Sequence, residues 1–496
     1  MRGRLFAVLA TMVLAAGLLP AVALATGDGT AQTYVVLYRN GASTRSAATV
    51  VSNAGGTLVA NYSAIGVVIA RSADPAFGER MRATSGVEGA ASTAGLGTRV
   101  DDDVISSDDA EALVSTPLAS FDDTTEPLWG LQWDMMQINT ADAHDITTGS
   151  PTVTVADLDT GLDFTHPDLA PNYDAAKSAD CSSGVALPLA AGNDQNGHGT
   201  HTAGTIAAAA NGIGIVGTAP GVKIAGVKSS NDDGFFFPEM VVCAYMWVAD
   251  HDIQVTNNSY FADPWLFNCA NDAEQRAIWK AEQRAMSHAQ SRGTTIVASM
   301  GNFSDDLAHP TQDVISPDTG PGEVRDISNA CRVVPNEIPG VVGVGATGPT
   351  ELKSFYSNYG SGVTDVAAPG GDSLADVRNG TANGRVLSTW PSYLGCGRPA
   401  SDQGATYCYL QGTSMAGPHA AGVAALIWST HPNATQAKVA ALLGSTATPA
   451  ACPTNLSRYA PFPSTSNGAP QTCSGGATSN SWYGQGIIDA YAAITH

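Results

Sequence analysis

The stretch TVTVADLDTGLDFTHPDL, from Thr152 to Leu169, opens with apolar and β-branched residues and turns polar at Asp157 and Asp159. An apolar run of this length, closed by a glycine, predicts a short buried strand that ends in a loop. A carboxylate directly after a buried strand costs free energy unless a partner satisfies it, which favours a functional role for Asp159. An Asp before Gly is also a common turn residue, and this stretch alone supports both interpretations.

Four further runs of similar character follow, separated by helical stretches: KIAGVK (223–228), IQVTNNS (253–259), TTIVASMGN (294–302) and GVVGVGAT (340–347). Short buried strands that alternate with helices predict an α/β fold with a mostly parallel central sheet and helices on both faces. In such sheets, functional residues gather at the carboxyl ends of the strands. The candidate residues considered below lie at such ends or in the loops beyond them.

The N-terminal sequence is typical of an export signal. It carries Arg2 and Arg4, then an apolar run, then an A-x-A cleavage sequence that ends at Ala25. We expect residues 1–25 to be a secretory signal peptide. A membrane anchor is less favoured because Pro20 and small residues close the run. No later segment is apolar for long enough to span a bilayer, so the sequence predicts a secreted, extracellular protein without a membrane partner.

Two further regions follow the predicted signal peptide. TYVVLYRNG (33–41) and GGTLVANYSAIGVVIARS (55–72) predict three strands, with a helix between the first and second, in a small α/β unit within residues 26–125. The segment 100–126 holds nine acidic residues and no basic one, which is typical of an exposed linker open to proteolysis. Residues 126–496 hold the predicted parallel sheet, with surface insertions expected near 304–337 and 370–402.

The cysteines and the net charge limit the class of protein. Eight cysteines without a C-x-x-C spacing, in an exported chain, predict disulfides rather than zinc ligands. Proximity favours pairing Cys396 with Cys408 and Cys452 with Cys473, while the other four would pair among themselves. The net charge of −22, from 45 acidic and 23 basic residues, argues against nucleic acid or an anionic membrane as a partner.

YLQGTSMAGPHAAGVAALI (409–427) places one serine between clusters of small residues. Because Pro418 is tolerated only in the first turn of a helix, we expect a helix to begin near Ser414. The unpaired N–H groups of a helix N-terminus can stabilise a developing negative charge. The alternative is that Ser414 is a structural N-cap, the commonest function of a serine at this place.

NDQNGHGTHTAGTIAA (193–208) offers His198 and His201 where a helix begins. They could bind a metal as H-x-x-H, although the H-E-x-x-H motif of zinc proteases is absent. Otherwise His198 is a general base and His201 is structural. A serine nucleophile needs such a base, a carboxylate to orient the base, and donors for the oxyanion. Asn302, after the strand of 294–300, is a candidate donor, with a turn residue as the alternative.

Together these stretches resemble the subtilisin-like serine proteases, or subtilases. DTG, HPDL, HGTHTAGTIAA, GTAPGVKI, SMGN, GTSMAGPHAAGVAALI and YGQGIIDAYAA carry the resemblance, which covers about Trp129 to the C-terminus. The order Asp159, His198, Ser414 also agrees with that of subtilisin.

The resemblance implies a serine endopeptidase that acts on protein or peptide substrates. Its Ser/His/Asp triad would be Ser414, His198 and Asp159, with Asn302 in the oxyanion hole. It implies that residues 26–125 are a propeptide that inhibits the enzyme and is removed by self-cleavage. No cofactor is implied for the chemistry. Substrate contacts would fall on Ser259, Tyr260, Phe261 and Gly301, although the family usually has Ser-Leu-Gly where this chain has Ser259-Tyr260-Phe261.

A structural calcium ion is also implied by the resemblance. Asp168, Gln132 and Asn211, with the carbonyls of Ala209, Ile213 and Ile215, would supply the oxygen ligands that calcium prefers. Three alternatives to a protease remain at this point: a catalytically silent scaffold with the same fold, a transpeptidase or cyclase that uses the same triad, and a metallohydrolase that uses His198 and His201.

Overall fold

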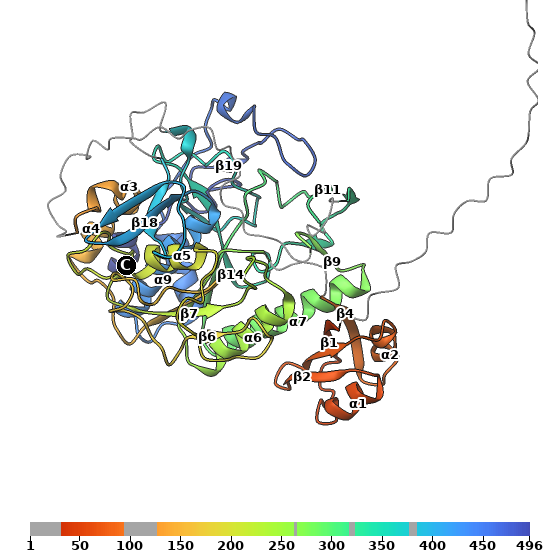
Figure 1. Ribbon diagram of the computed structural model, residues 1–496. Helices are drawn as coiled ribbons and strands as arrows, with labels where there is room; N and C mark the ends of the chain where they lie inside the picture. The colour runs from red at the N-terminus through yellow and green to blue at the C-terminus, as the bar shows by residue number, and fades with distance from the viewer. Residues whose placement is uncertain (1–30, 94–125, 262–264, 317–322, 376–383) are drawn as a thin grey trace, which may run out of the picture.

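The computed structural model describes residues 31–93, 126–261, 265–316, 323–375 and 384–496. The predicted signal peptide at 1–25 and the acidic segment at 100–125 lie outside these ranges. Two units are visible, a small one at the N-terminus and a large one that contains the rest (Figure 1).

The small unit is a four-stranded antiparallel sheet in the order β2-β3-β1-β4. Alternate residues of β1 pack on opposite sides: Tyr34 and Val36 contact the two helices of the unit, whereas Val35 and Leu37 join the core formed by α6 and α7 of the large unit. Both faces of this sheet are therefore buried, and Figure 1 shows the unit beside α7. Its elements are β1 (Gln32–Tyr38), α1 (Ala47–Asn53), β2 (Thr57–Tyr62), β3 (Val67–Ser72), α2 (Phe77–Arg82) and β4 (Val87–Ser92).

The large unit is built on a seven-stranded parallel sheet in the order β15-β14-β10-β8-β5-β7-β6. The predicted α/β fold with a mostly parallel sheet is confirmed, and each of the five predicted runs contains a strand. Its strands are β5 (Thr154–Asp159), β6 (Ala179–Asp180), β7 (Lys223–Lys228), β8 (Val255–Asn258), β10 (Thr295–Ser299), β14 (Val341–Thr347) and β15 (Val366–Pro369).

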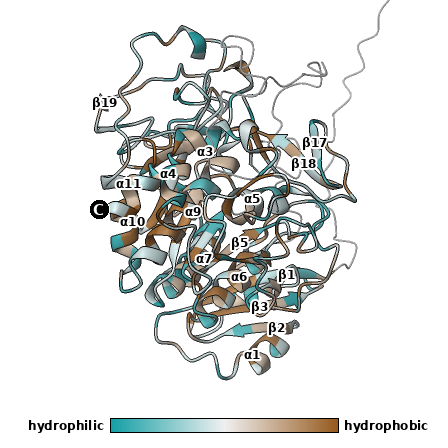
Figure 2. Cartoon of the chain, turned by 90° about the vertical axis from the view of Figure 1, so that its left-hand side faces the viewer, coloured by the Kyte–Doolittle hydropathy of each residue, from teal (hydrophilic) through white to brown (hydrophobic). Residues whose placement is uncertain are grey.

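Helices cover both faces of this sheet. Helices α5 and α9 pack with Val155 and Val297 on one face, and α6 and α7 pack with Leu158 and Ile296 on the other. The interior around α9 and β5 is largely hydrophobic, while many outer loops are hydrophilic (Figure 2). The main helices are α5 (His198–Ala207), α6 (Pro238–Asp250), α7 (Ala273–Ser291), α9 (Thr413–Thr430), α10 (Gln436–Ser445) and α11 (Ala490–Thr495).

Shorter elements complete the large unit. They are η1 (Trp129–Leu131), α3 (Trp133–Gln137), α4 (Thr140–His144), β9 (Asn268–Cys269), β11 (Gln312–Asp313), β12 (Arg325–Asp326), β13 (Cys331–Arg332), β16 (Val386–Thr389), β17 (Pro399–Asp402), β18 (Ala405–Leu410), η2 (Ser457–Tyr459), β19 (Gly475–Gly476) and β20 (Ser479–Asn480).

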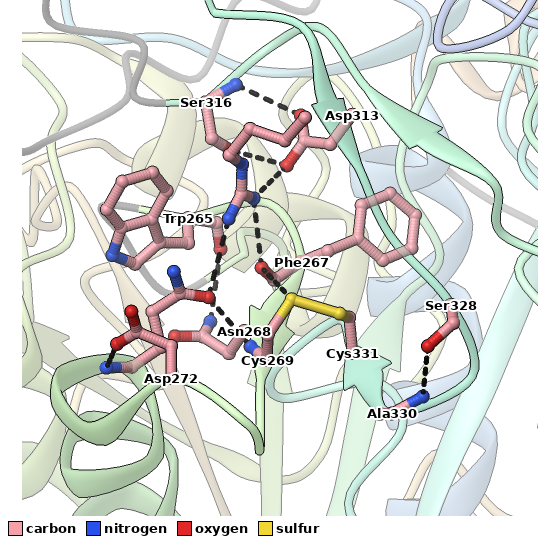
Figure 3. The surroundings of a disulfide bond; sticks show 12 residues. Trp265, Phe267, Asn268, Cys269, Asp272, Asp313, Ser316, Ser328, Ala330 and Cys331 are labelled. Carbon is pink, nitrogen blue, oxygen red and sulfur yellow. Dashed lines mark hydrogen bonds and ion pairs between the residues drawn. A yellow bond between two sulfur atoms is a disulfide. The ribbon is translucent and has the colours of Figure 1, made fainter.

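Four disulfides are formed, and both predicted pairs, Cys396–Cys408 and Cys452–Cys473, are confirmed. The remaining cysteines pair as Cys181–Cys243 and Cys269–Cys331. The second of these joins β9 to β13 and thereby fastens the region of 304–337 to the chain before α7 (Figure 3).

The prediction that 370–402 is a surface insertion is wrong for part of this region. All four residues of β16 are buried, and the Ser388 and Thr389 hydroxyls donate to the His201 and Thr200 carbonyls at 2.6 Å each. This strand supports α5, so its burial follows from a contact with a helix almost two hundred residues earlier, which the local sequence does not reveal.

Candidate active site

Asp159 and His198 meet at the carboxyl end of β5. The Asp159 Oδ1 and His198 Nδ1 atoms lie 2.7 Å apart, and both side chains are almost fully buried. Helix α5 can begin this close to β5 because Gly199 has no side chain: a Cβ there would lie 2.2 Å from the Gly161 carbonyl oxygen. The chain reaches His198 through Gly197, whose φ of +95° favours glycine.

A second carboxylate holds this turn together. Asp194 Oδ1 accepts hydrogen bonds from the Thr160 hydroxyl at 3.0 Å and the Gly197 N–H at 2.8 Å, and Oδ2 accepts from the Thr200 N–H and hydroxyl. Asp194 therefore ties the loop after β5 to the first turn of α5. Asp194 was not identified from the sequence, where its only signal is its position four residues before His198.

Burial raises the pKa of the Asp159 carboxyl, while the His198 imidazole and the Thr160 N–H act in the opposite direction. A carboxylate on Nδ1 fixes the imidazole tautomer and stabilises its protonated form, so that Nε2 can accept a proton from a hydroxyl group. The pair therefore has the arrangement that a general base requires.

Ser414 is the second residue of α9 and is 4% exposed. The N-cap position belongs to Gly412, so the interpretation of Ser414 as a structural N-cap is wrong. Its hydroxyl donates to the Ser259 carbonyl at 3.3 Å, which brings the nucleophile candidate to the end of β8.

Pro418 lies in the sixth position of α9, so its expected place in the first turn is also wrong. A proline there has no N–H for the carbonyl four residues earlier, which is that of Ser414. The Ser259 hydroxyl donates to this carbonyl at 2.9 Å instead. The helix can therefore contain a proline close to the candidate nucleophile because Ser259, directly after β8, supplies the missing donor.

Asn302 lies just beyond β10 and contacts the start of α9. Its Oδ1 accepts hydrogen bonds from the Thr413 N–H at 2.8 Å and the Thr413 hydroxyl at 2.9 Å. The Thr413 hydroxyl in turn accepts from the Gly301 N–H at 2.9 Å. These contacts orient the amide so that its nitrogen points away from Thr413, as an oxyanion donor would require. Thr413 was not identified from the sequence.

The candidate substrate residues line up after β8 and β10. Ser259 and Tyr260 are buried, and the Tyr260 ring stacks on Phe236 with centroids 4.2 Å apart. Phe261 is partly exposed and contacts Phe303 edge-on, with centroids 6.1 Å apart. Gly301 adopts a φ of +94°, and a Cβ there would meet Asn358 Nδ2 at 2.7 Å. The aromatic rings of Tyr260 and Phe261 thus stand where the family usually has Leu and Gly.

His201 has a different environment from His198. Its Nε2 lies 3.0 Å from the Cys408 carbonyl oxygen, whereas His198 directs Nδ1 to Asp159. Among the described residues, no group of three or more His, Cys, Asp or Glu side chains is arranged to hold a metal ion. The two histidines are therefore engaged separately, which does not fit the metallohydrolase alternative.

The candidate calcium ligands gather around one loop, and one oxygen of each side chain accepts a hydrogen bond from the protein. Asp168 Oδ2 accepts from the Tyr407 hydroxyl at 2.7 Å, Gln132 Oε1 from the Val216 N–H at 3.0 Å, and Asn211 Oδ1 from the Ile213 N–H at 2.9 Å. The carbonyls of Ala209, Ile213 and Ile215 belong to the same loop. Within the part of the chain that the structure describes, Asp168 Oδ1 is buried without a hydrogen-bond partner, so one carboxylate oxygen of this set is left for a cation, and the calcium site stays a prediction.

Comparison with known proteins agrees with the geometry. The sequence signature of the Subtilase family matches residues 150–486. An extracellular protease of Xanthomonas campestris pv. campestris is 29% identical over 79% of this chain and 59% of its own length. M-protease of Shouchella clausii is 29% identical over 69% of this chain and 73% of its own. The chain thus covers less than two thirds of the Xanthomonas relative.

Among solved structures, the epidermin leader peptide processing serine protease EpiP from Staphylococcus aureus superposes with a TM-score of 0.66 at 22% identity. The match covers 94% of this chain and 98% of EpiP. A match confined to residues 126–496 could not cover 94% of this chain, so the similarity in fold extends into the small N-terminal unit. In the part of the chain that the structure describes, no helix has the length and apolar character needed to cross a bilayer.

Proposed function

Because the chain belongs to the subtilase family of serine endopeptidases, we propose that it hydrolyses peptide bonds through Ser414, His198 and Asp159. The observation that carries the proposal is the buried contact between Asp159 and His198 at the same edge of the sheet as Ser414. Asp159 orients His198, His198 takes the Ser414 proton, and Ser414 Oγ attacks the peptide carbonyl.

The next steps follow from the start of α9. The carbonyl oxygen of the substrate gains negative charge as Ser414 Oγ bonds to its carbon, and Asn302 Nδ2 with the Ser414 N–H stabilises that charge. His198 then gives its proton to the leaving amine, which departs as the acyl-enzyme forms. Water then attacks the acyl carbon as His198 takes its proton, the bond from that carbon to Ser414 Oγ breaks, and His198 returns the proton to Oγ as the acid leaves. The protein's own residues supply every step, and no cofactor enters this chemistry.

We further propose that the chain is secreted and that the N-terminal unit is a propeptide that inhibits the enzyme until self-cleavage. Besides the apolar contact of Val35 and Leu37 with α6 and α7, the unit is fastened by charged contacts: Glu88 pairs with Lys280 and with Arg284, the latter at 2.8 Å, and Arg82 pairs with Glu274 at 3.0 Å. Surface pairs of this kind contribute little each, so they add a salt-dependent part to the apolar contact.

We also propose a structural calcium ion at the loop around Asn211. Asp168 Oδ1, which is buried without a hydrogen-bond partner among the described residues, would be one ligand, and Gln132 Oε1, which accepts from the Val216 N–H, would be another. Addition of a chelator separates the alternatives: a lower melting temperature would support the ion, and an unchanged one would support closure of the loop by hydrogen bonds.

The deciding experiment expresses the whole chain as wild type, as Ser414→Ala, and as Ser457→Ala, a control at an exposed serine. Wild type and the control should be shortened and should cleave casein, whereas Ser414→Ala should do neither. A serine-directed phosphonyl reagent should abolish activity and a zinc chelator should not. Equal masses with no cleavage would support a silent scaffold. Peptide ligation in place of hydrolysis would support a transpeptidase.

A further inference from the structure

A second buried carboxyl group lies on β5, two residues before Asp159. Asp157 is 1% exposed and projects from the same face of the strand as Asp159, because alternate residues share a face. Its Oδ2 lies 2.6 Å from the Thr202 hydroxyl of α5, and its Oδ1 accepts from the Asn257 amide of β8 at 2.8 Å. Asp157 therefore contacts both the helix that carries His198 and the strand that leads to Ser259.

The hydrogen bonds continue from both of these contacts. The Thr202 hydroxyl lies 3.2 Å from the His198 carbonyl, in the first turn of α5. On the other side, Asn257 Nδ2 donates to the Ser259 hydroxyl at 3.0 Å, and that hydroxyl donates to the Ser414 carbonyl at 2.9 Å. An unbroken series of buried contacts thus connects the backbone of His198 to that of Ser414, with Asp157 at its centre.

We propose that Asp157 is a positioning residue for the hydrolytic reaction, and that as a neutral carboxylic acid it fixes the first turns of α5 and α9 relative to each other. This inference rests on the proposed function. Asp157 touches no reacting atom; it acts through Thr202 on His198 and through Asn257 and Ser259 on Ser414.

The surroundings of Asp157 favour the neutral form. Burial raises its pKa well above the usual value, and the nearby Asp159 carboxylate raises it further, against the hydrogen bonds of Asn257 and Thr202 and the His198 imidazole. On the flanking strands, Gly226 and Asn257 stand opposite Asp157 and neither can ionise. Lys228, opposite Asp159, donates to the Thr160 and Asn193 carbonyls.

The neutral acid also matches the donors and acceptors around it. Its hydroxyl can donate to Thr202 Oγ1, so that the Thr202 proton is directed to the His198 or Gly199 carbonyl, and its carbonyl oxygen accepts from Asn257. Asparagine has the same shape and the same one donor and one acceptor in these directions, without a charge. Asp157→Asn is therefore the conservative variant, and Asp157→Val removes the connection.

The experiment measures kcat, KM and the pH profile of the full chain after processing. Asp157→Asn should keep kcat within about twofold and leave the acid limb of kcat/KM, which reports His198, unchanged. Asp157→Val and Thr202→Val should each lower kcat by roughly tenfold with little change in KM, because misplaced catalytic groups slow the chemical step. The double valine variant should be no slower than either single variant, since both break the same connection.

Two outcomes would overturn the inference. Wild-type kcat in both valine variants would show that Asp157 positions nothing. A shift of the acid limb to lower pH in Asp157→Asn would show that Asp157 carries a charge beside His198. The pKa of His198 is also measured by NMR in the Ser414→Ala background, where no hydrolysis is needed. If wild type proves inactive, the proposed function fails, and a lowered His198 pKa in Asp157→Asn would still reject the neutral acid.

Discussion

Thr413 holds the candidate oxyanion donor in place, and Thr413→Val isolates the contribution of its hydroxyl. Valine preserves the shape of the side chain and the backbone N–H. It removes the 2.9 Å hydrogen bond to Asn302 Oδ1 and leaves the 2.8 Å bond from the N–H. It also removes the acceptor of the Gly301 N–H. Asn302 therefore stays in the site with one fewer restraint on its amide.

The size of the effect can be estimated from these bonds. Removing an oxyanion donor outright costs about 2.7–4 kcal/mol in a protease of this family, or roughly 10²–10³ in kcat, which is the expectation for Asn302→Ala. Loss of one orienting hydrogen bond weakens the donor by about 1 kcal/mol. This corresponds to a decrease of roughly fivefold in kcat for Thr413→Val.

Steady-state hydrolysis of a chromogenic peptide by the processed enzyme checks this estimate. KM should change little, because the oxyanion forms only in the transition state. Thr413→Ser keeps the hydroxyl and serves as the matched control, with kcat close to wild type. Thr413→Val should have no further effect in the Asn302→Ala background. Independent, multiplicative losses in the double variant would refute the conclusion that Thr413 acts through Asn302.

Two other predictions concern stability and the N-terminal unit. Burial raises the pKa of Asp168 to about 7, so the folded protein keeps this proton to higher pH than the unfolded chain. The contribution of this carboxyl group to the free energy of unfolding is fully present below about pH 4 and is lost as the pH rises through about 7. The melting temperature of Asp168→Asn, which cannot ionise, should therefore rise relative to that of wild type as the pH increases from 4 to 7. A difference in melting temperature that stays constant over this range would contradict the raised pKa of Asp168. Glu88→Gln should let the cleaved N-terminal unit separate from the large unit at lower salt on gel filtration, because both its ion pairs are lost. Equal retention in wild type and variant would reject this role.

Local patterns predicted the central strands because each is a short apolar run that lies inside the sheet. The same patterns missed β15, where Val366–Pro369 is a very short run, and placed β16 on the surface. The two short-range disulfides were predictable from proximity, whereas Cys181–Cys243 and Cys269–Cys331 each join residues 62 apart. The resemblance to a family supplied the candidate catalytic residues, but the residues that orient them, Asp194 and Thr413, required the structure.

Local sequence preferences are overridden at two positions close to the candidate functional residues, and the physical reason is the same at both. Pro418 in a helix interior and Asp157 on a buried strand each appear unfavourable beside their own neighbours in the chain. Each is satisfied by a distant partner: Ser259 bonds to the Ser414 carbonyl across 155 residues, and Asn257 bonds to Asp157 across 100. Local preference can be overridden wherever the fold supplies such a partner. An unfavourable residue next to a catalytic motif is therefore a signal in itself, since it indicates a contact that the fold must provide.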